Sequence, residues 1–292
     1  MRIAVIGAGR MGKWFAKFFL EQGLSVVVSD KDWEKLQKLR EELNVEIADI
    51  VKAVKSADRI IVCVPIDNFE DVIREISIHI KPGQEVMDIC SVKENPVNIM
   101  HRYISNTVTL GTHPMFGPGA KSIRGQNFIL TPTNTKEQTL AKDFGKWLEN
   151  KGANVFFMTP KEHDKIMSIV IGLPYFLCHV VCDTLLSSGE FKKAKEVSGV
   201  SYRLLLNLTE AVVSEETELS VSVQMSLPNL DDLGELLSKK IGEWLDIVRR
   251  KNKTELVEKI TMLKGELAKV DPRYSETYKY MYKILEVVNG EC

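Results

Sequence analysis

Three glycines near the start of the chain have a spacing at which backbone N–H groups can bind phosphate. The string Gly7-Ala8-Gly9-Arg10-Met11-Gly12 matches G-x-G-x-x-G and stands between a β-branched run and an amphipathic helical pattern. The first glycine permits a tight turn, the second lets a pyrophosphate approach, and the third lets helix and strand pack closely. The positive end of the helix would favour the phosphates. A glycine-rich turn without a ligand is the alternative.

An acidic residue follows the second predicted strand. Asp30 can accept hydrogen bonds from ribose hydroxyls, which favours NAD over NADP. The neighbouring Lys31 would tolerate a 2′-phosphate, so NADP stays open. The predicted cofactor site consists of Gly7, Ala8, Gly9, Arg10, Met11, Gly12, Asp30, Val64 and Pro65.

A string rich in Gly and Pro surrounds His113. Pro114 biases His113 away from helix, so we expect a rigid loop that directs one imidazole toward the cofactor crevice. Histidine transfers protons near neutral pH, which makes His113 a candidate base. A histidine that only satisfies loop carbonyls is the alternative. Ser91 and Lys93 follow another predicted strand, and strand ends of this kind gather at one edge of a parallel sheet.

The elements that must position these residues alternate up to about residue 160. Predicted strands are 2–6, 25–29, 59–64, 85–90, 108–110, 128–131 and 154–157, and predicted helices are 11–22, 32–43, 69–80 and 136–151. Beyond residue 160 helical periodicity dominates. The pattern predicts an α/β Rossmann-type, doubly wound, mostly parallel sheet over 1–160, then an all-α substrate and dimerisation domain over 161–292.

One segment, 166–182, is almost entirely apolar. It is near the lower length limit for a membrane span, but Gly172, Pro174, Tyr175 and His179 interrupt it. We therefore expect a buried interface helix with both faces covered, rather than a span. In a domain this small, such a helix suggests a homodimer through the helical half.

Composition excludes several classes of protein. The 292 residues carry 39 Lys and Arg against 40 Asp and Glu, a net charge of −1, so no basic excess favours nucleic acid or an anionic membrane. The N-terminus shows no secretory pattern. The five cysteines are Cys63, Cys90, Cys178, Cys182 and Cys292, and none forms a CxxC pair. Neither a disulfide framework nor a metal site is expected, which fits a cytoplasmic protein.

Several strings, taken in order, resemble the prephenate dehydrogenase family. They are the glycine motif, Asp88-Ile89-Cys90-Ser91-Val92-Lys93, His113-Pro114-Met115-Phe116-Gly117-Pro118, Glu162-His163-Asp164 and Tyr202-Arg203-Leu204. The resemblance covers residues 1 to about 228, and the second and third strings are far more diagnostic than the glycines.

The resemblance implies an NAD(P)-dependent oxidative decarboxylation of prephenate to 4-hydroxyphenylpyruvate in tyrosine biosynthesis, with no metal. It implies that His113 takes the proton of the ring hydroxyl. It also implies that Ser91 lies beside this hydroxyl and either fixes the tautomer of His113 or contacts substrate, with capping of the following helix as the alternative. Arg203 would bind a substrate carboxylate through two parallel hydrogen bonds. Lys93 would supply positive potential, with an ordinary solvated lysine as the alternative. Tyr175 stands where many relatives carry histidine, which leaves prephenate or arogenate open.

Other hypotheses remain at this point. One is an arogenate dehydrogenase. Another is a β-hydroxy acid dehydrogenase of the same layout, for which Lys165 is the candidate catalytic lysine, although the His-Pro-Met string argues against it. A third is a non-catalytic nucleotide-sensing protein. His163 and Asp164 open the second domain, and helix capping by Asp164 would explain them about as well as a functional role.

Overall fold

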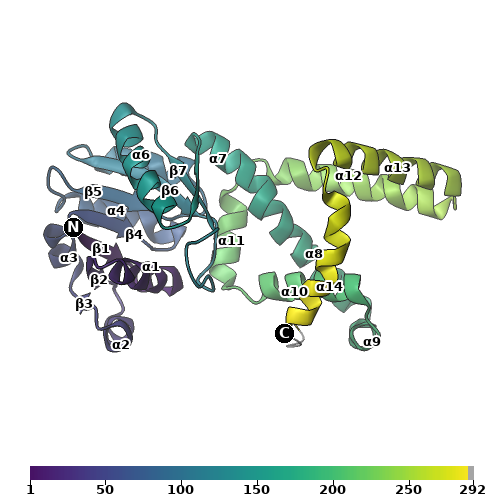
Figure 1. Ribbon diagram of the computed structural model, residues 1–292, viewed down its shortest axis with the longest axis horizontal. Coiled ribbons are helices and arrows are strands. Elements are labelled where there is room, and N and C mark those ends of the chain that lie inside the picture. The colour runs from purple at the N-terminus through teal and green to yellow at the C-terminus, as the bar shows by residue number, and fades with distance from the viewer. Residues whose placement is uncertain (289–292) are drawn as a thin grey trace. The chain divides into compact units, whose positions relative to one another are not determined.

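The computed structural model describes residues 1–288, so Cys292 lies outside the described residues. Two compact units are present (Figure 1). The first contains residues 1–167 and 225–227, and the second contains the remaining described residues. The first unit therefore ends after Met167 rather than at residue 160. The reason is that the helix containing His163 and Asp164 is hydrogen-bonded into the first unit.

The first unit is built on an eight-stranded sheet in the order β3-β2-β1-β4-β5-β6-β7-β8. Its strands are β1 (Arg2–Ile6), β2 (Ser25–Ser29), β3 (Glu46–Ile47), β4 (Arg59–Val62), β5 (Glu85–Asp88), β6 (Val108–Pro114), β7 (Asn127–Thr131) and β8 (Asn154–Phe157). All neighbours pair in parallel except β6 with β7. The strand order reverses between β1 and β4, where ligands bind in open sheets of this kind. The predicted α/β doubly wound fold is confirmed.

Helices cover both faces of this sheet. They are α1 (Arg10–Glu21), α2 (Trp33–Leu43), α3 (Ile50–Ser56), α4 (Phe69–Ser77), α5 (Glu94–Tyr103), α6 (Thr135–Asn150) and α7 (Pro160–Met167), with a 3₁₀ turn η1 (Ile66–Asn68). Side chains of β1 alternate between two buried clusters. Ile3 and Val5 pack with α1, α2 and α6, whereas Ala4 and Ile6 pack with α3, α4 and α5.

The second unit is helical throughout its described residues. Its elements are a π-helical turn η2 (Ser168–Gly172), α8 (Leu173–Ser187), α9 (Phe191–Glu196), α10 (Val200–Val213), α11 (Thr217–Ser226), α12 (Leu230–Arg249), α13 (Lys253–Val270), η3 (Tyr274–Glu276) and α14 (Thr277–Val288). Figure 1 shows α12 and α13 side by side, and α8 packs against α10. The predicted all-helical second half is confirmed.

The apolar segment expected at 166–182 belongs to one continuous helix, Pro160–Ser187. This helix is long and apolar enough to cross a membrane by length and composition. Cys178 is the buried residue of α8, whereas Val180 and Leu186 are exposed. Residues 1–288 leave one face of α8 exposed, so the expectation that a second subunit covers this face stays a prediction.

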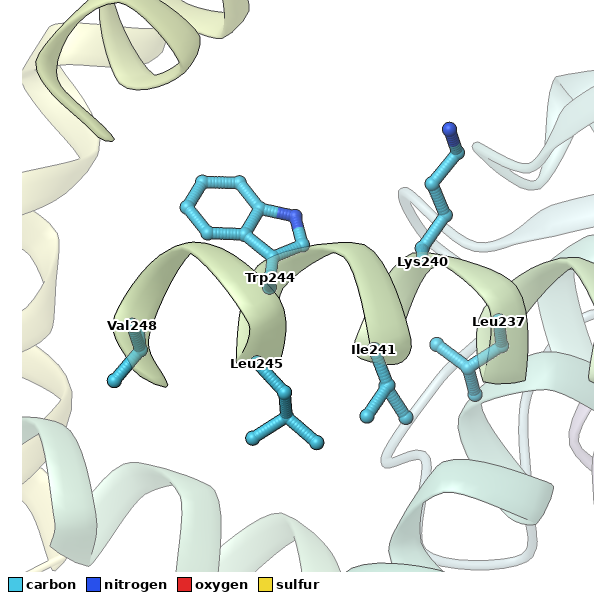
Figure 2. A pocket seen from close by; sticks show the side chains of 6 residues that line it. All are labelled: Leu237, Lys240, Ile241, Trp244, Leu245 and Val248. Carbon is cyan, nitrogen blue, oxygen red and sulfur yellow. The ribbon is translucent and has the colours of Figure 1, made fainter. Parts of the chain in front are cut away.

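A further apolar surface lies on α12. A hollow of about 360 Å³ is lined by Leu237, Lys240, Ile241, Trp244, Leu245 and Val248. Figure 2 shows Ile241 and Leu245 pointing to one side of the helix and Trp244 to the other. None of the predicted site residues lines this hollow, so it is part of the exposed apolar surface of the second unit rather than the predicted site.

Candidate active site

The glycine turn joins β1 to α1 and is tightly constrained at its two ends. Gly7 has a φ of +111°, and a Cβ there would meet the carbonyl oxygen of Cys63 at 2.3 Å. A Cβ on Gly12 would meet the Gly7 carbonyl oxygen at 1.9 Å. Both positions therefore require glycine for the packing of β1, α1 and the end of β4.

Gly9, the middle glycine of the motif, is not confined by neighbouring atoms. A Cβ on Gly9 would stand in open space, and no side chain caps the N-terminus of α1 at Gly9. A helix N-terminus leaves backbone N–H groups without intrahelical partners. The opening beside Gly9 and these donors fit the pyrophosphate of a dinucleotide. Arg10 is exposed and Met11 half-buried at this first turn of α1.

Asp30 holds the glycine turn from the end of β2. Its carboxylate accepts the N–H of Ala8 at 2.6 Å and the N–H of Asp32 at 2.8 Å. Val64 approaches the turn from β4, with its Cγ1 3.2 Å from the Cβ position of Gly7, and Pro65 is exposed beside it. The structure therefore brings the predicted cofactor residues together at the ends of β1, β2 and β4.

His113 lies within a strand rather than in the expected loop. It belongs to β6 and is opposite Ile129 of the antiparallel strand β7. The side chain is 4% exposed. Burial, followed by the nearby His163 and Lys93, holds the pKa of His113 well below its usual value. The imidazole is therefore neutral at physiological pH, as a base must be before it accepts a proton.

His163 is the hydrogen-bonding partner of His113. Nδ1 of His113 lies 2.8 Å from Nε2 of His163, and Nδ1 of His163 lies 2.7 Å from Oδ1 of Asp164. Burial lowers the pKa of His163, although the Asp164 carboxylate opposes this shift. His163 was not among the site residues predicted from the sequence. The Glu-His-Asp string was the available signal, but the contact spans 50 positions of sequence.

Asp164 caps a helix other than its own. Its two carboxylate oxygens accept the N–H groups of Lys93 at 2.6 Å and Glu94 at 2.8 Å. These donors stand at the N-terminus of α5, which has no cap from its own segment. The expectation that Asp164 is the N-cap of the helix it opens is wrong, because Asp164 lies inside α7.

Lys93 does not present its ammonium to solvent. The side chain is 0% exposed, and its Nζ donates to the carboxylate of Asp88 and to the carbonyl oxygen of Thr112. The expectation that Lys93 binds substrate is corrected by this burial. The side chain instead fixes the residue before His113. Gly111 makes room for Thr131 and Val97, since a Cβ there would lie 2.3 Å from Oγ1 of Thr131 and 2.7 Å from Cγ2 of Val97.

Ser91 follows β5 and is half-buried. Within residues 1–288, no hydrogen bond joins Ser91 to His113, whose Nδ1 is occupied by His163. The tautomer of His113 is therefore not set by Ser91, and contact with substrate is the remaining expectation for this hydroxyl. Ser91 does not cap α5 either.

The remaining predicted substrate residues lie in the second unit, near opposite ends of α10. Arg203 is in its first turn, whereas the Tyr175 hydroxyl donates to Glu215, just beyond its last turn, at 2.7 Å. The ten-residue rise from Arg203 to Val213, the last residue of α10, spans about 15 Å. Burial and Glu215 raise the pKa of Tyr175, so the hydroxyl keeps its proton.

A protein-family model and known proteins match the sequence of this chain. The family model described as prephenate dehydrogenase, nucleotide-binding domain, matches residues 15–157. A "Probable arogenate/prephenate dehydrogenase" of Methanocaldococcus jannaschii is 33% identical over 265 residues, covering 88% of this chain and 59% of the relative. The matched segment, residues 15–157, belongs to the prephenate dehydrogenase nucleotide-binding domain family.

Other relatives share less sequence with this chain. The T-protein of Enterobacter agglomerans is 24% identical over 87% of this chain and 64% of its own length. The chain thus spans less than two thirds of these two relatives. A crystal structure of prephenate dehydrogenase from Aquifex aeolicus, in complex with hydroxyphenyl propionate and NAD⁺, has a TM-score of 0.74 at 21% identity, covering 93% of this chain and 98% of that one. This likeness supports the fold.

The first unit supplies two features that fit this family. One is a glycine turn with open space beside Gly9, which fits the pyrophosphate of a dinucleotide. The other is a buried, neutral imidazole at His113, held by a hydrogen-bonded chain through His163 to Asp164. Among residues 1–288, no group of three or more His, Cys, Asp or Glu side chains is placed to hold a metal ion.

Proposed function

We propose that this protein oxidises prephenate with NAD, releasing carbon dioxide and forming 4-hydroxyphenylpyruvate. The observation that carries the proposal is the neutral, buried imidazole of His113 in the same unit as the open glycine turn. The family model and the name of the Methanocaldococcus jannaschii relative support prephenate or arogenate as the substrate.

His113 would act on the ring hydroxyl of the substrate. Its Nε2 accepts the hydroxyl proton while the same carbon loses hydride, which leaves a ring ketone. The bond to the ring carboxylate then breaks, carbon dioxide leaves, and the electron pair completes the aromatic ring. The ring oxygen takes back one proton, so the base is regenerated. NAD, when bound, supplies the hydride acceptor. A positioned base contributes about 10²–10⁴-fold to such a step.

We assign Ser91 to the ring hydroxyl of the substrate and Arg203 to one of its carboxylates. Tyr175 lies near the other end of α10 from Arg203, so its hydroxyl is not assigned to the same substrate molecule. Arg203→Gln should weaken substrate affinity while the affinity for NAD stays within about twofold, because the guanidinium pairs with a carboxylate through two hydrogen bonds. An unchanged KM for substrate would reject the assignment of Arg203.

Arogenate is the second candidate substrate, since the Methanocaldococcus jannaschii relative is named for both arogenate and prephenate. Arogenate carries an ammonium group where prephenate carries a ketone. A larger kcat/KM with arogenate than with prephenate would contradict the choice of prephenate.

NAD is proposed over NADP. A carboxylate at the end of β2, here Asp30, accepts hydrogen bonds from ribose hydroxyls and repels a 2′-phosphate. The exposed Lys31 is the feature that would favour NADP.

The exposed apolar residues of the second unit support a homodimer. They include Val180 and Leu186 on α8, and Ile260, Leu263 and Leu267 on α13. Exposed apolar surface on helices is typical of interfaces when it is extensive. Analytical ultracentrifugation should give twice the chain mass of 33.0 kDa, and a monomer mass would contradict the proposal. We also propose a cytoplasmic location and no binding to nucleic acid or membrane.

The decisive test of the function is absorbance in the reduced-nicotinamide band. Protein is mixed with prephenate or arogenate, each with NAD or NADP, in four parallel reactions. We expect the largest kcat/KM with prephenate and NAD, with release of carbon dioxide equal to the cofactor reduced. Cofactor binding without reduction in all four reactions would contradict an enzymatic role and favour a nucleotide-sensing protein.

A further inference from the structure

We propose that His163 and Asp164 are positioning residues that hold His113 in the tautomer with its proton on Nδ1 and a bare lone pair on Nε2. The proposal rests on the proposed function for its catalytic meaning, but the tautomer itself follows from the contacts in the first unit. It gives the Glu-His-Asp string a role beyond capping and packing.

The assignment of protons starts at Asp164. Its carboxylate accepts two backbone N–H groups, from Lys93 and Glu94, and two such donors favour the ionised form. An ionised carboxylate only accepts, so His163 must donate through Nδ1, which lies 2.7 Å from Oδ1 of Asp164. Neutral His163 therefore has no proton on Nε2.

The protonation of His163 in turn determines the tautomer of His113. The bare Nε2 of His163 is an acceptor 2.8 Å from Nδ1 of His113, so His113 must donate through Nδ1. A neutral imidazole has one ring proton, which leaves Nε2 of His113 bare. Within residues 1–288, this nitrogen has no hydrogen-bond partner. These hydrogen bonds therefore leave the lone pair on Nε2 of His113, which is the nitrogen that can act as a base.

Hydrogen-bond donation in the opposite direction, from His163 to His113, would need a positively charged His163. A proton on both nitrogens of His163 would direct an N–H at Nδ1 of His113 and force the opposite tautomer. Burial disfavours that cation, and the Lys93 ammonium nearby disfavours it further, although Asp164 and Asp88 act in the other direction. The rings are also fixed in place, because Lys93 contacts Asp164 through its backbone and Asp88 through its side chain.

During the proposed reaction the same contacts would stabilise the charged base. When Nε2 of His113 gains a proton, the ring becomes a cation whose Nδ1–H still donates to His163. His163 in turn donates to the Asp164 carboxylate, so the new charge lies two hydrogen bonds from an anion. Orientation of a catalytic imidazole by a second group of this kind affects kcat more than substrate binding.

The tautomer can be measured directly, without any substrate. Long-range ¹H–¹⁵N spectra of protein labelled with [¹⁵N]histidine distinguish the two nitrogens of each ring, and the chain has five histidines. His113→Asn and His163→Gln assign the two signals. We expect both His113 and His163 to be neutral and protonated on Nδ1 at neutral pH. A proton on Nε2 of His113 would overturn the proposal whether or not the protein turns over prephenate.

Variants test whether the tautomer matters for rate. His163→Leu removes the acceptor, so His113 should populate both tautomers and kcat should fall about 10–10²-fold, part of the range for a general base. KM for NAD should stay within about twofold. His163→Gln retains an acceptor for the Nδ1 proton of His113 and should recover part of the loss. An unchanged kcat in His163→Leu would overturn the positioning role.

A matched control is available in the same unit. His101 also pairs with a buried carboxylate, at 2.6 Å from Glu137, but it makes no hydrogen bond to His113 among the described residues. His101→Leu should leave kcat and the His113 tautomer unchanged. An equal loss of kcat in both histidine variants would show a general packing effect and contradict the proposal. If the wild-type protein reduces no cofactor with either substrate, the proposed function fails while the tautomer measurement still stands.

Discussion

The ammonium group of Lys93 and the carboxylate of Asp88 form an ion pair in which both side chains are fully buried. Asp88 also accepts the N–H of Cys90, and Lys93 also donates to the carbonyl oxygen of Thr112. The pair therefore connects the end of β5 to the residue that precedes His113. Its contribution is to hold the backbone of the site, since neither charge reaches solvent.

Replacing Lys93 with Met should strongly destabilise the first unit. The substitution keeps the apolar stem and leaves the Asp88 carboxylate buried without its cation, which typically costs about 3–5 kcal/mol. Urea denaturation measures the loss. The double variant Lys93→Met with Asp88→Asn should recover much of it, because no uncompensated charge remains. A Lys93→Met variant as stable as the wild type would show that the carboxylate is not charged in the fold.

Two alanine substitutions in the glycine turn should have opposite consequences. Gly12→Ala forces a Cβ against the Gly7 carbonyl and should cost about 1–3 kcal/mol of folding free energy, as overpacking does. Gly9→Ala meets no atom and should change stability by less than about 0.5 kcal/mol. It should nevertheless weaken NAD binding at least about tenfold, because the methyl group occupies the place of the pyrophosphate.

Two measurements check these predictions for Gly12→Ala and Gly9→Ala. Calorimetric titration with NAD gives the affinity of each variant, and thermal melting curves give its stability. Tight NAD binding by Gly9→Ala would show that the pyrophosphate does not lie against Gly9.

Acid should destabilise the protein from about pH 6.5 downward. The pKa values of His113 and His163 are lowered in the fold from a usual value of 6.5, so the unfolded chain binds more protons below that pH. This part of the stability is complete above pH 6.5 and is lost as the pH falls toward the folded pKa values. Each histidine contributes at most about 1.4 kcal/mol per pH unit.

Urea denaturation at a series of pH values between about 7.5 and 5 measures this slope. His113→Asn cannot take up the proton and should flatten part of the slope. A stability that is constant over this range would show that both imidazoles are exposed to solvent or already charged in the folded state.

His113→Asn should depress kcat by about 10²-fold or more, because it removes the base and keeps a side chain of similar size. The affinity for substrate should change little. Steady-state kinetics with prephenate and NAD measure both quantities, with His101→Asn as the control. Turnover near the wild-type rate would remove His113 from the mechanism.

The glycine turn and the alternating strands were predictable because both depend on residues close together in sequence. Gly7 to Gly12 and Asp30 are at their predicted places, and the ends of most strands agree within a few residues. β6 was predicted too short, since Gly111 and Pro114 are unusual in strands. Their backbone pairs with Thr131 and Phe128 of β7, and local propensity carries no information about that pairing.

The contacts within the site were less predictable, because they join distant parts of the chain. Helix α5 was not predicted at all, since its N-terminal cap comes from Asp164, 70 residues beyond Glu94. For the same reason Lys93 was expected at the surface and His163 at a helix start. Residue type made His113 a candidate base, but the histidine that is hydrogen-bonded to it could be found only from the fold.

The two cysteine side chains next to this network have a consequence for handling the protein. Burial and the Asp88 carboxylate raise the pKa of both Cys63 and Cys90. The thiolate is the form that reacts with alkylating agents and peroxides, so these two sulfurs should resist both. We expect the nucleotide-binding unit to tolerate aerobic storage without a reductant, and inactivation by oxidants to begin elsewhere in the chain.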